Sequence, residues 1–273
     1  MLIGFGISPS RVKVTGGAAA FDADAQAFFT AASITDSTQK SAVNQLVLDL
    51  KSYNIWSKMK AIYPIVGGSA ATHKWNLKDP RDLNAAYRLL FTTGWTHSST
   101  GMLPNGTSAY AQTSLNGTTA LTANNSHVSF YSRTNSDNIG MDFGNTANAF
   151  GSITRSANAL ISDFLGNGSQ FSASPDRLQP ANTSSNAFFI FSSTSTNIKI
   201  YKNNTTLVSK GSATASAYPN TEILLSYGTT SGANRYSNRE LSFASIGDGL
   251  SDAEASNFRT AVQAYQTTLS RNV

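Results

Sequence analysis

The chain has no cysteine among its 273 residues. A disulfide framework, a zinc–thiolate site and a cysteine nucleophile are therefore excluded. Secreted eukaryotic domains with such a β-rich pattern usually carry disulfides. The absence of cysteine argues against that class of protein.

Charged side chains are also scarce. They make up 13% of the chain, whereas typical soluble domains have roughly 25%, and serine, threonine and asparagine take their place. Such a polar but uncharged surface is commoner on extracellular and virion proteins than on cytosolic enzymes. The formal net charge is +5, but the lysines and arginines are scattered and form no basic stripe. We therefore expect no nucleic-acid partner.

Long apolar runs are missing as well. No stretch approaches the ~18 apolar residues that cross a bilayer, so we expect no membrane insertion. The start MLIGFGISPSRVKV has neither the basic segment nor the apolar length of a signal peptide. These features predict a soluble protein without an export signal of its own.

Residues 1–20 are predicted to form an extended arm. Its apolar side chains would be sticky if exposed, and docking against a neighbouring subunit would cover them. A frayed terminus is the alternative. The predicted docking residues are Leu2, Ile3, Phe5, Ile7, Val12 and Val14.

Residues 21–60 have helical spacing. Acidic residues open the segment Asp22–Ala32 and favour a helix start there. Asp36 and Gln39 predict a capping box for a second helix, which is followed by a half-turn that places Trp56 in a core. One face of the second helix carries Val43, Leu46, Val47 and Leu50.

From residue 61 the apolar spacing changes to two. Short runs such as VSFY (128–131) and EILLSY (222–227) alternate with Gly- and Asn-rich turns. This pattern predicts half-buried strands of an antiparallel sandwich. Residues 139–143 are predicted as a strand, and residues 93–97 as a turn.

The C-terminal segment returns to helical spacing. Ser251 and Glu254 predict a capping box, and Phe258, Val262 and Tyr265 share one helix face. The predicted organisation is an arm (1–20), a helical lead (21–60) and a mainly β sandwich with a C-terminal helix (61–273). The helices lie at the two ends of the sequence, so we expect them to pack together on one side.

The segment Ala187–Gly249 contains FFIFSSTSTNIKIYKNNTTLV, PNTEILLSYG and RELSFASIGDG in series. It resembles concanavalin A-like lectin/glucanase (laminin-G-like) jelly-roll domains. Preceded by a helical lead that includes KSYNIWSKMKAIYPIVGG, the pattern over residues 21–271 is similar to structural proteins of tailed bacteriophages.

The resemblance implies a non-enzymatic virion structural protein, either a decoration protein or a fibre or tail component, built on an antiparallel concanavalin A-like jelly-roll β-sandwich. The implied partners are other virion proteins, further copies of the chain in a homo-oligomer, and host glycans; the implied location is the virion. Two alternatives stay open because the fold hosts many functions. They are a carbohydrate-binding receptor-recognition module and a glycan-cleaving enzyme.

A sugar site would combine an aromatic platform with polar side chains, because a pyranose has an apolar face and polar edges. Aromatic residues near predicted turns are the candidates, although the tryptophans could instead belong to the core. The loop Gly232–Arg239 is the best surface candidate. The predicted ligand-binding residues are Trp75, Trp95, Arg235, Tyr236 and Arg239, and Tyr110 and Tyr131 have similar surroundings.

Catalysis would need paired carboxylates. Glucanases of this fold resemble one another in a Glu-x-Asp-x-Glu strand, which this sequence lacks. Glu254 lies close to Asp252, but at a helix start. Glu222 and Glu240 each begin a predicted strand, and an enzyme would need them to face one groove. We assign no catalytic residue.

Metal ligands show no clear spacing. His73, His97 and His127 are far apart in sequence, and no EF-hand pattern occurs. We assign no cofactor and no metal residue, with calcium at the sandwich rim as the alternative. The candidate calcium ligands are Asp137, Asp142, Asp163, Asp176 and Asp248.

Overall fold

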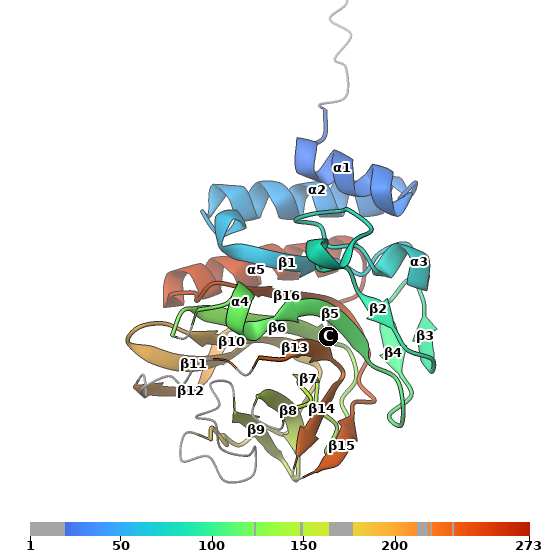
Figure 1. The fold of residues 1–273 in the computed structure, drawn as a ribbon. Coiled ribbons are helices and arrows are strands. Elements are labelled where there is room, and N and C mark those ends of the chain that lie inside the picture. The colour runs from blue at the N-terminus through green and yellow to red at the C-terminus, as the bar shows by residue number, and fades with distance from the viewer. Residues whose placement is uncertain are drawn as a thin grey trace, which may run out of the picture.

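Two antiparallel sheets and a layer of helices are stacked in the computed structural model (Figure 1). The structure describes residues 20–122, 124–147, 150–163, 177–211, 218, 220–230 and 232–273. We call the sheet in the middle of the stack the inner sheet and the other one the outer sheet. The expected mainly β sandwich with N-terminal helices and a C-terminal helix is confirmed. The predicted arm residues lie outside the described residues, and the division into three segments stays a prediction.

The inner sheet has eight strands. Seven of them follow one another in the order β12 (Thr205–Gly211), β11 (Asn197–Lys202), β10 (Ala187–Ser193), β6 (Ser126–Ser132), β16 (Leu241–Gly247), β4 (Met102–Pro104) and β3 (Trp95–His97). The eighth, β1 (Met59–Tyr63), pairs with β16 beside β4.

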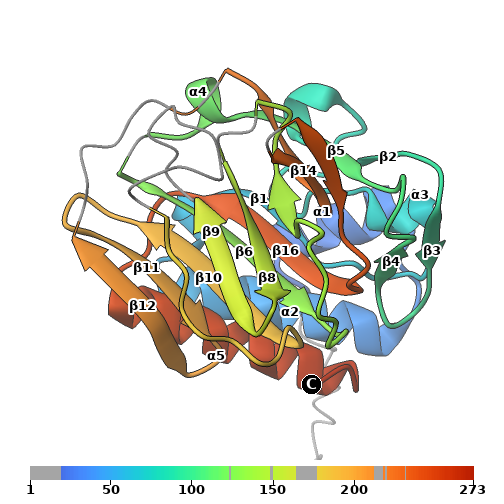
Figure 2. The same cartoon turned by 90° about the horizontal axis from the view of Figure 1, so that it is seen from below.

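The outer sheet has six strands and carries a separate hairpin at one end. In Figure 2, strands β8 and β9 lie in front of the inner sheet, with α2 and α5 behind it. The strand order is β2 (Leu90–Phe91), β5 (Ala111–Asn116), β13 (Glu222–Leu225), β7 (Phe143–Gly144), β8 (Gly151–Ser156) and β9 (Ala159–Asp163). The hairpin consists of β14 (Tyr227–Thr230) and β15 (Ala233–Tyr236).

The helices begin where their capping residues predict. Asp22 caps α1 (Ala23–Ala32), and Asp36 caps α2 (Ser37–Ser52) by accepting from the Gln39 N–H. Ser251 and Glu254 form the reciprocal capping box of α5 (Asp252–Thr268). The short elements are η1 (Trp56–Lys58), α3 (Ala70–His73), η2 (Asn84–Ala86) and α4 (Gly117–Ala120).

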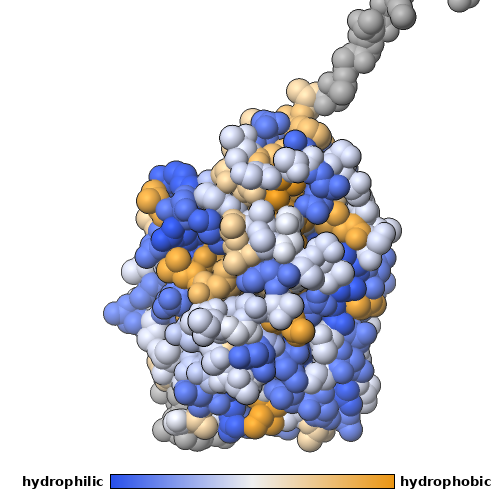
Figure 3. Space-filling model, turned by 90° about the vertical axis from the view of Figure 1, so that its right-hand side faces the viewer, coloured by the Kyte–Doolittle hydropathy of each residue, from blue (hydrophilic) through white to orange (hydrophobic). Residues whose placement is uncertain are grey.

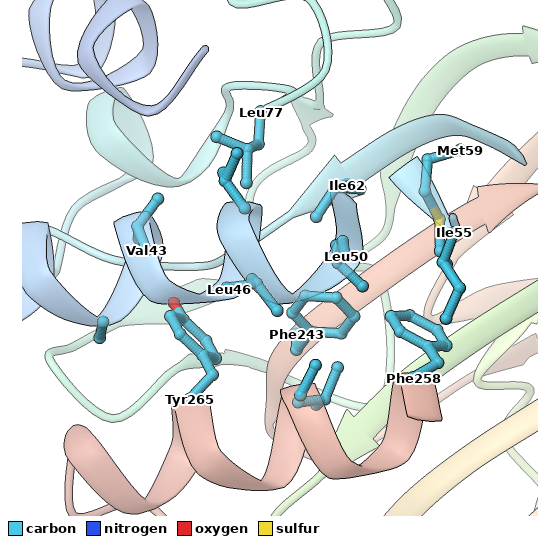
Figure 4. Packing of buried hydrophobic residues seen from close by; sticks show 14 of the residues in the cluster. Val43, Leu46, Leu50, Ile55, Met59, Ile62, Leu77, Phe243, Phe258 and Tyr265 are labelled. Carbon is cyan, nitrogen blue, oxygen red and sulfur yellow. The ribbon is translucent and has the colours of Figure 1, made fainter. Parts of the chain in front are cut away.

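Side chains alternate along the central strands of the inner sheet (β6, β10 and β16), and both faces of these strands are buried. Phe189 and Phe191 of β10 point into the core between the sheets, whereas Phe188 and Ile190 point into a second core under α1, α2 and α5. Figure 4 shows this second core, where the ring centroids of Phe243 and Phe258 are 6.0 Å apart. Packing of the terminal helices on one side is thus confirmed. The half-buried character predicted for β10 is wrong, because the helices cover its second face.

Three local predictions are also wrong. Residues 95–97 form β3 rather than a turn, because they pair with β4. Of the strand predicted over 139–143, only Phe143 enters β7, since the preceding residues turn to meet the hairpin. The third prediction, that Trp56 enters a core, is wrong only in degree: Trp56 packs against the second core but is partly buried, and the Lys78 ammonium lies 4.2 Å from its ring centroid. The fully buried residue there is Ile55, which immediately precedes η1.

The surface is mostly polar. On the face shown in Figure 3, apolar residues are scattered among polar ones. Among the described residues, no helix combines the length and apolar character that a bilayer crossing needs. The large apolar side chains that stay exposed are Phe21, Leu48, Leu83, Leu103, Ile139 and Val273.

Replacing Phe258 with alanine should lower the free energy of unfolding by about 3–5 kcal/mol, because it leaves a cavity beside Phe188 and Phe243. Urea denaturation measures the change. Ser256→Ala, at an exposed position of the same helix, is the control and should stay within about 0.5 kcal/mol of the parent. A Phe258 variant as stable as the control would show that α5 does not depend on this core.

Candidate functional site

Three tyrosine rings line one hollow on the exposed face of the outer sheet. The ring centroids of Tyr110 and Tyr227 are 5.1 Å apart, and those of Tyr227 and Tyr236 are 4.9 Å apart. The hollow has a volume of about 310 Å³, at the lower end of the range for small-molecule sites. We call it the tyrosine hollow; among the described residues it is lined by Tyr110, Gln112, Thr146, Glu222, Leu224, Tyr227 and Tyr236.

Strand pairing brings these residues together. Tyr227 and Tyr236 lie directly opposite each other at the base of the β14–β15 hairpin. Leu224 of β13 is paired with Gln112 of β5, and Tyr110 comes just before β5. Neighbouring residues in both strands, Leu225 and Ala111, point the other way into the core between the sheets. The hollow therefore lies outside the core, on the opposite face of the same strands.

Polar groups complete the wall. The Ser114 N–H donates to Oε1 of Glu222, and the Gln112 amide lies 3.5 Å from Oε2. Burial raises the pKa of Glu222, although backbone hydrogen bonds oppose the change. Burial also raises the pKa of Tyr227, helped by the two neighbouring phenols, so Tyr227 stays neutral at physiological pH. The hollow thus offers ring faces, a hydrogen-bonding carboxyl and an amide.

A buried ion pair anchors the hairpin that carries Tyr227 and Tyr236. The Arg239 guanidinium contacts the Asp142 carboxylate at 3.2 Å, and both side chains are almost fully buried. Asp142 also accepts from the Ser237 hydroxyl, which follows Tyr236 directly. The remaining guanidinium N–H groups donate to the carbonyl oxygens of Ser136, Asn138, Gly140 and Arg155.

The same network holds the preceding loop against the hairpin. Met141 forms a parallel bridge to Tyr236. Glycine at position 140 permits this approach, because a Cβ there would lie 2.0 Å from the Tyr236 carbonyl oxygen. On the other side, the Thr154 N–H and hydroxyl both donate to Asp142. Loop, hairpin and outer sheet are therefore fixed at one point beside the hollow.

Tyr236 is the only member of the predicted ligand-binding set among the described residues that line the hollow. The prediction that Arg239 lies on the surface is wrong: it is 0% exposed. Arg235 is half-buried, and its Nε donates to the Thr230 hydroxyl at 2.7 Å. The predicted loop Gly232–Arg239 is instead strand β15 followed by the buried anchor, because residues 233–236 pair with β14.

The two predicted tryptophans lie elsewhere and are partly buried. The Trp75 indole donates to the Ala71 carbonyl, and the Trp95 indole donates to the Tyr110 carbonyl at 3.1 Å. Tyr131 is fully buried in the second core, between the inner sheet and the helices, which we call the helix-side core. Tyr110 does line the hollow, as its polar surroundings in the sequence indicated. No sequence pattern indicated Tyr227 as a site residue, because it stands at the end of an apolar run typical of a strand.

The two glutamates of the enzyme hypothesis lie on different sheets. Glu240 comes just before β16 of the inner sheet, where Arg133 pairs with it at 3.0 Å and the Thr100 hydroxyl donates to it at 2.6 Å. Glu240 is absent from the described lining of the hollow, and Glu254 is occupied by its capping box. Glu222 therefore has no carboxylate partner among those described lining residues.

The histidines do not form one cluster. His73 and His97 meet with their Nδ1 atoms 2.9 Å apart, while His127 lies under α5, bonded to the Asp248 carbonyl. The Gly68 N–H donates to Nε2 of His73, so Nδ1 of His73 carries the proton and donates to His97. Within the described ranges, no group of three or more His, Asp or Glu side chains is arranged to hold a metal ion.

The aspartates named for calcium do not converge either. Asp142 is held by Arg239, Asp248 lies 3.4 Å from the Lys60 ammonium, and Asp137 accepts from the Ala157 N–H. Asp163 is buried in β9, and Asp176 lies outside the described residues. Calcium binding stays a prediction.

No protein-family model and no curated protein sequence matches the chain. Among solved structures, a Trypanosoma rangeli sialidase mutant with trans-sialidase activity is similar at 8% identity and a TM-score of 0.51, over 82% of this chain and 39% of that one. Botulinum neurotoxin type C, whose cell entry depends on two ganglioside molecules, is similar at 11% identity and a TM-score of 0.51, over 77% of this chain and 53% of the toxin chain.

A third similar structure is the binding domain of botulinum neurotoxin DC in complex with rat synaptotagmin II. It shares 12% identity and a TM-score of 0.50, over 77% of this chain and 53% of that one. The chain thus spans about two-fifths of the sialidase and about half of each toxin chain. At these identities the similarity shows only the fold, an antiparallel β-sandwich.

Replacing Arg239 with methionine should lower the free energy of unfolding by roughly 3–5 kcal/mol, because Asp142 would stay buried without its cation. The double variant Arg239→Met/Asp142→Leu should regain much of this loss. Arg81→Met is the control, since it removes an ion pair whose arginine is 63% exposed, and it should barely move the urea midpoint. Equal losses in Arg239→Met and Arg81→Met would contradict the anchoring role.

Acid should destabilise the fold through its histidines. Burial, with His97 nearby, lowers the pKa of His73 from 6.5 to about 3, and burial lowers that of His127 to about 4. The unfolded chain binds protons near pH 6.5, so the stability present above that pH falls as the pH drops towards these values. His73→Gln should flatten the decline between pH 6 and 4 by up to about 1.4 kcal/mol per pH unit. An unchanged slope in denaturation series would show that His73 is not held neutral.

Proposed function

We propose that the protein is a carbohydrate-binding module and that the tyrosine hollow is its binding site. The observation that carries this proposal is the row of three adjacent tyrosine rings beside Glu222 and Gln112. The β-sandwich fold is compatible with this role but does not decide it, because the fold hosts many functions.

The chemistry of the wall matches that of a sugar ring. The C–H groups of a pyranose face can pack on the partly exposed rings of Tyr110 and Tyr236, while its hydroxyls bond the amide and carboxyl groups at the edge. Tyr227 is already oriented, because its phenol donates to Asn234 at 2.7 Å. Little ordering of that side chain remains to be done on binding.

We propose binding without cleavage. Glycoside hydrolysis by most enzymes uses two carboxyl groups on either side of the scissile bond, and among the described lining residues Glu222 stands alone. Incubating the protein with a bound oligosaccharide should release no new reducing ends. Release that stops in Glu222→Gln would overturn this part of the proposal.

A bacteriophage virion remains our prediction for where the module works, as a homo-oligomer joined to other virion proteins through residues 1–20. What supports it is the composition and the resemblance over residues 21–271. Deleting residues 1–20 should convert the oligomer to a monomer, as measured by light scattering. A deletion variant with the parent's mass would count against the docking arm.

Tyr236→Ala should weaken glycan binding roughly tenfold, a loss of about 1.4 kcal/mol, because it removes one of the three rings. A glycan array identifies the ligand, and calorimetry then compares the variants. Tyr53→Ala removes a partly buried tyrosine packed against the helix-side core and should leave affinity unchanged. Parent affinity in Tyr236→Ala would exclude the tyrosine hollow as the site.

A further inference from the structure

We propose that the tyrosine hollow takes an uncharged sugar and that Glu222 is the residue that rejects acidic ones. This inference rests on the proposed function. Glu222 is the one acidic or basic side chain among the described lining residues, and neither lysine nor arginine lines the hollow there. Proteins typically recognise the carboxylate of an acidic sugar with a lysine or arginine side chain, arginine above all. The charge pattern of the wall is the opposite of what an acidic sugar needs.

An arginine adjoins the lining residue Tyr236 in the sequence, but it does not supply a positive charge to the hollow. Arg235 precedes Tyr236 in β15, and successive strand side chains point to opposite faces. Arg235 therefore points away from the face that carries Tyr236. Its Nε donates to the Thr230 hydroxyl within the hairpin. Arg239 is occupied by Asp142 and four carbonyl groups beneath the hairpin.

Glu222 is held ready to accept hydrogen bonds. The Ser114 N–H donates to Oε1, and the backbone hydrogen bonds from Ser114 and Thr113 favour the ionised form against the burial that raises the Glu222 pKa. The Gln112 amide lies a long 3.5 Å from Oε2, which leaves this oxygen able to accept a closer bond from a sugar hydroxyl. Such a bond to an ionised acceptor is stronger than one between neutral groups.

An acidic sugar would meet the same carboxylate at a cost. Its own carboxylate offers no donor and brings a second negative charge into a partly buried site without a counter-ion. Sialic acids carry such a carboxylate. The inference therefore separates the ligand of this chain from a sialylated glycan, although the fold is similar to that of a sialidase.

Matched probe pairs that differ only at the carboxyl group test the proposal. Suitable pairs are the methyl ester of sialyllactose with free sialyllactose, and methyl-esterified oligogalacturonide with the free acid, each measured by calorimetry against the full-length chain. We expect the parent to bind the uncharged member of a pair at least tenfold more tightly. In Glu222→Gln, which keeps the oxygen that accepts from Ser114, this ratio should fall by roughly tenfold. Asp49→Asn makes the same charge change on helix α2 and should leave the ratio unchanged.

The outcomes separate the two proposals. Equal or tighter binding of the acidic member by the parent, or a ratio unaltered in Glu222→Gln, overturns the charge selectivity while carbohydrate binding stands. Binding that survives Tyr236→Ala removes the hollow as the site, and with it the role of Glu222. A parent chain that binds no member of any pair and no glycan on the array overturns both proposals.

Discussion

The central strands of the inner sheet, β6, β10 and β16, are buried on both faces, and the other layers depend on this. These strands carry large apolar side chains of both parities, such as Phe188 beside Phe189 in β10. The set that includes Phe189 is covered by the outer sheet, and the set that includes Phe188 is covered by the helices. Leaving either set in water would lose the free energy of apolar burial. Two segments at opposite ends of the chain, α2 and α5, are therefore joined on one surface. The tyrosine hollow forms on the other face of the outer sheet, which points away from the core between the sheets.

The hollow depends on a different interaction from the cores. Burying Arg239 and Asp142 costs solvation that their attraction does not fully return, so apolar side chains could hold the sheets together equally well. The ion pair instead fixes the relative orientation of these segments. The planar Arg239 guanidinium donates to carbonyl groups of the loop before β7 (Asn138 and Gly140) and of β8 (Arg155). The Asp142 carboxylate also accepts from the Ser237 hydroxyl, and this hydrogen bond fixes the position of the neighbouring Tyr236. Precise placement of the rings thus relies on polar contacts.

Local signals made part of this structure predictable from the sequence. Asp22, Asp36 and Ser251 cap helices because their side chains reach N–H groups two or three residues ahead, within the window that a sequence pattern covers. The apolar faces of α2 and α5 follow from helical spacing in the same way. These signals identified the fold class, but they did not show which strands are buried on both faces. No pattern within β10 itself indicates that helices will cover its second face.

The site was less predictable because its contacts are distant in the chain. Arg239 stands among small polar residues, a pattern typical of a surface loop, yet its carbonyl partners lie 84 to 103 positions away. Tyr227 ends an apolar run and resembles a core residue. Tyr227 is indeed 7% exposed, and it reaches the lining of the hollow because Ser226, with a positive φ of 63°, breaks the strand and turns the chain into the hairpin. The pairing of Tyr227 with Tyr236 across Gly232 could have been inferred from the glycine as a hairpin signal.

The β14–β15 hairpin forms a two-stranded sheet of its own. Its outer residues, Ala233 and Asn234, are exposed and contribute to neither apolar core. Substitutions at these two positions can therefore change the surface beside the hollow and leave both apolar cores intact. The hairpin tip tolerates sequence change, whereas its base is fixed by the buried contacts of Arg239 and Asp142.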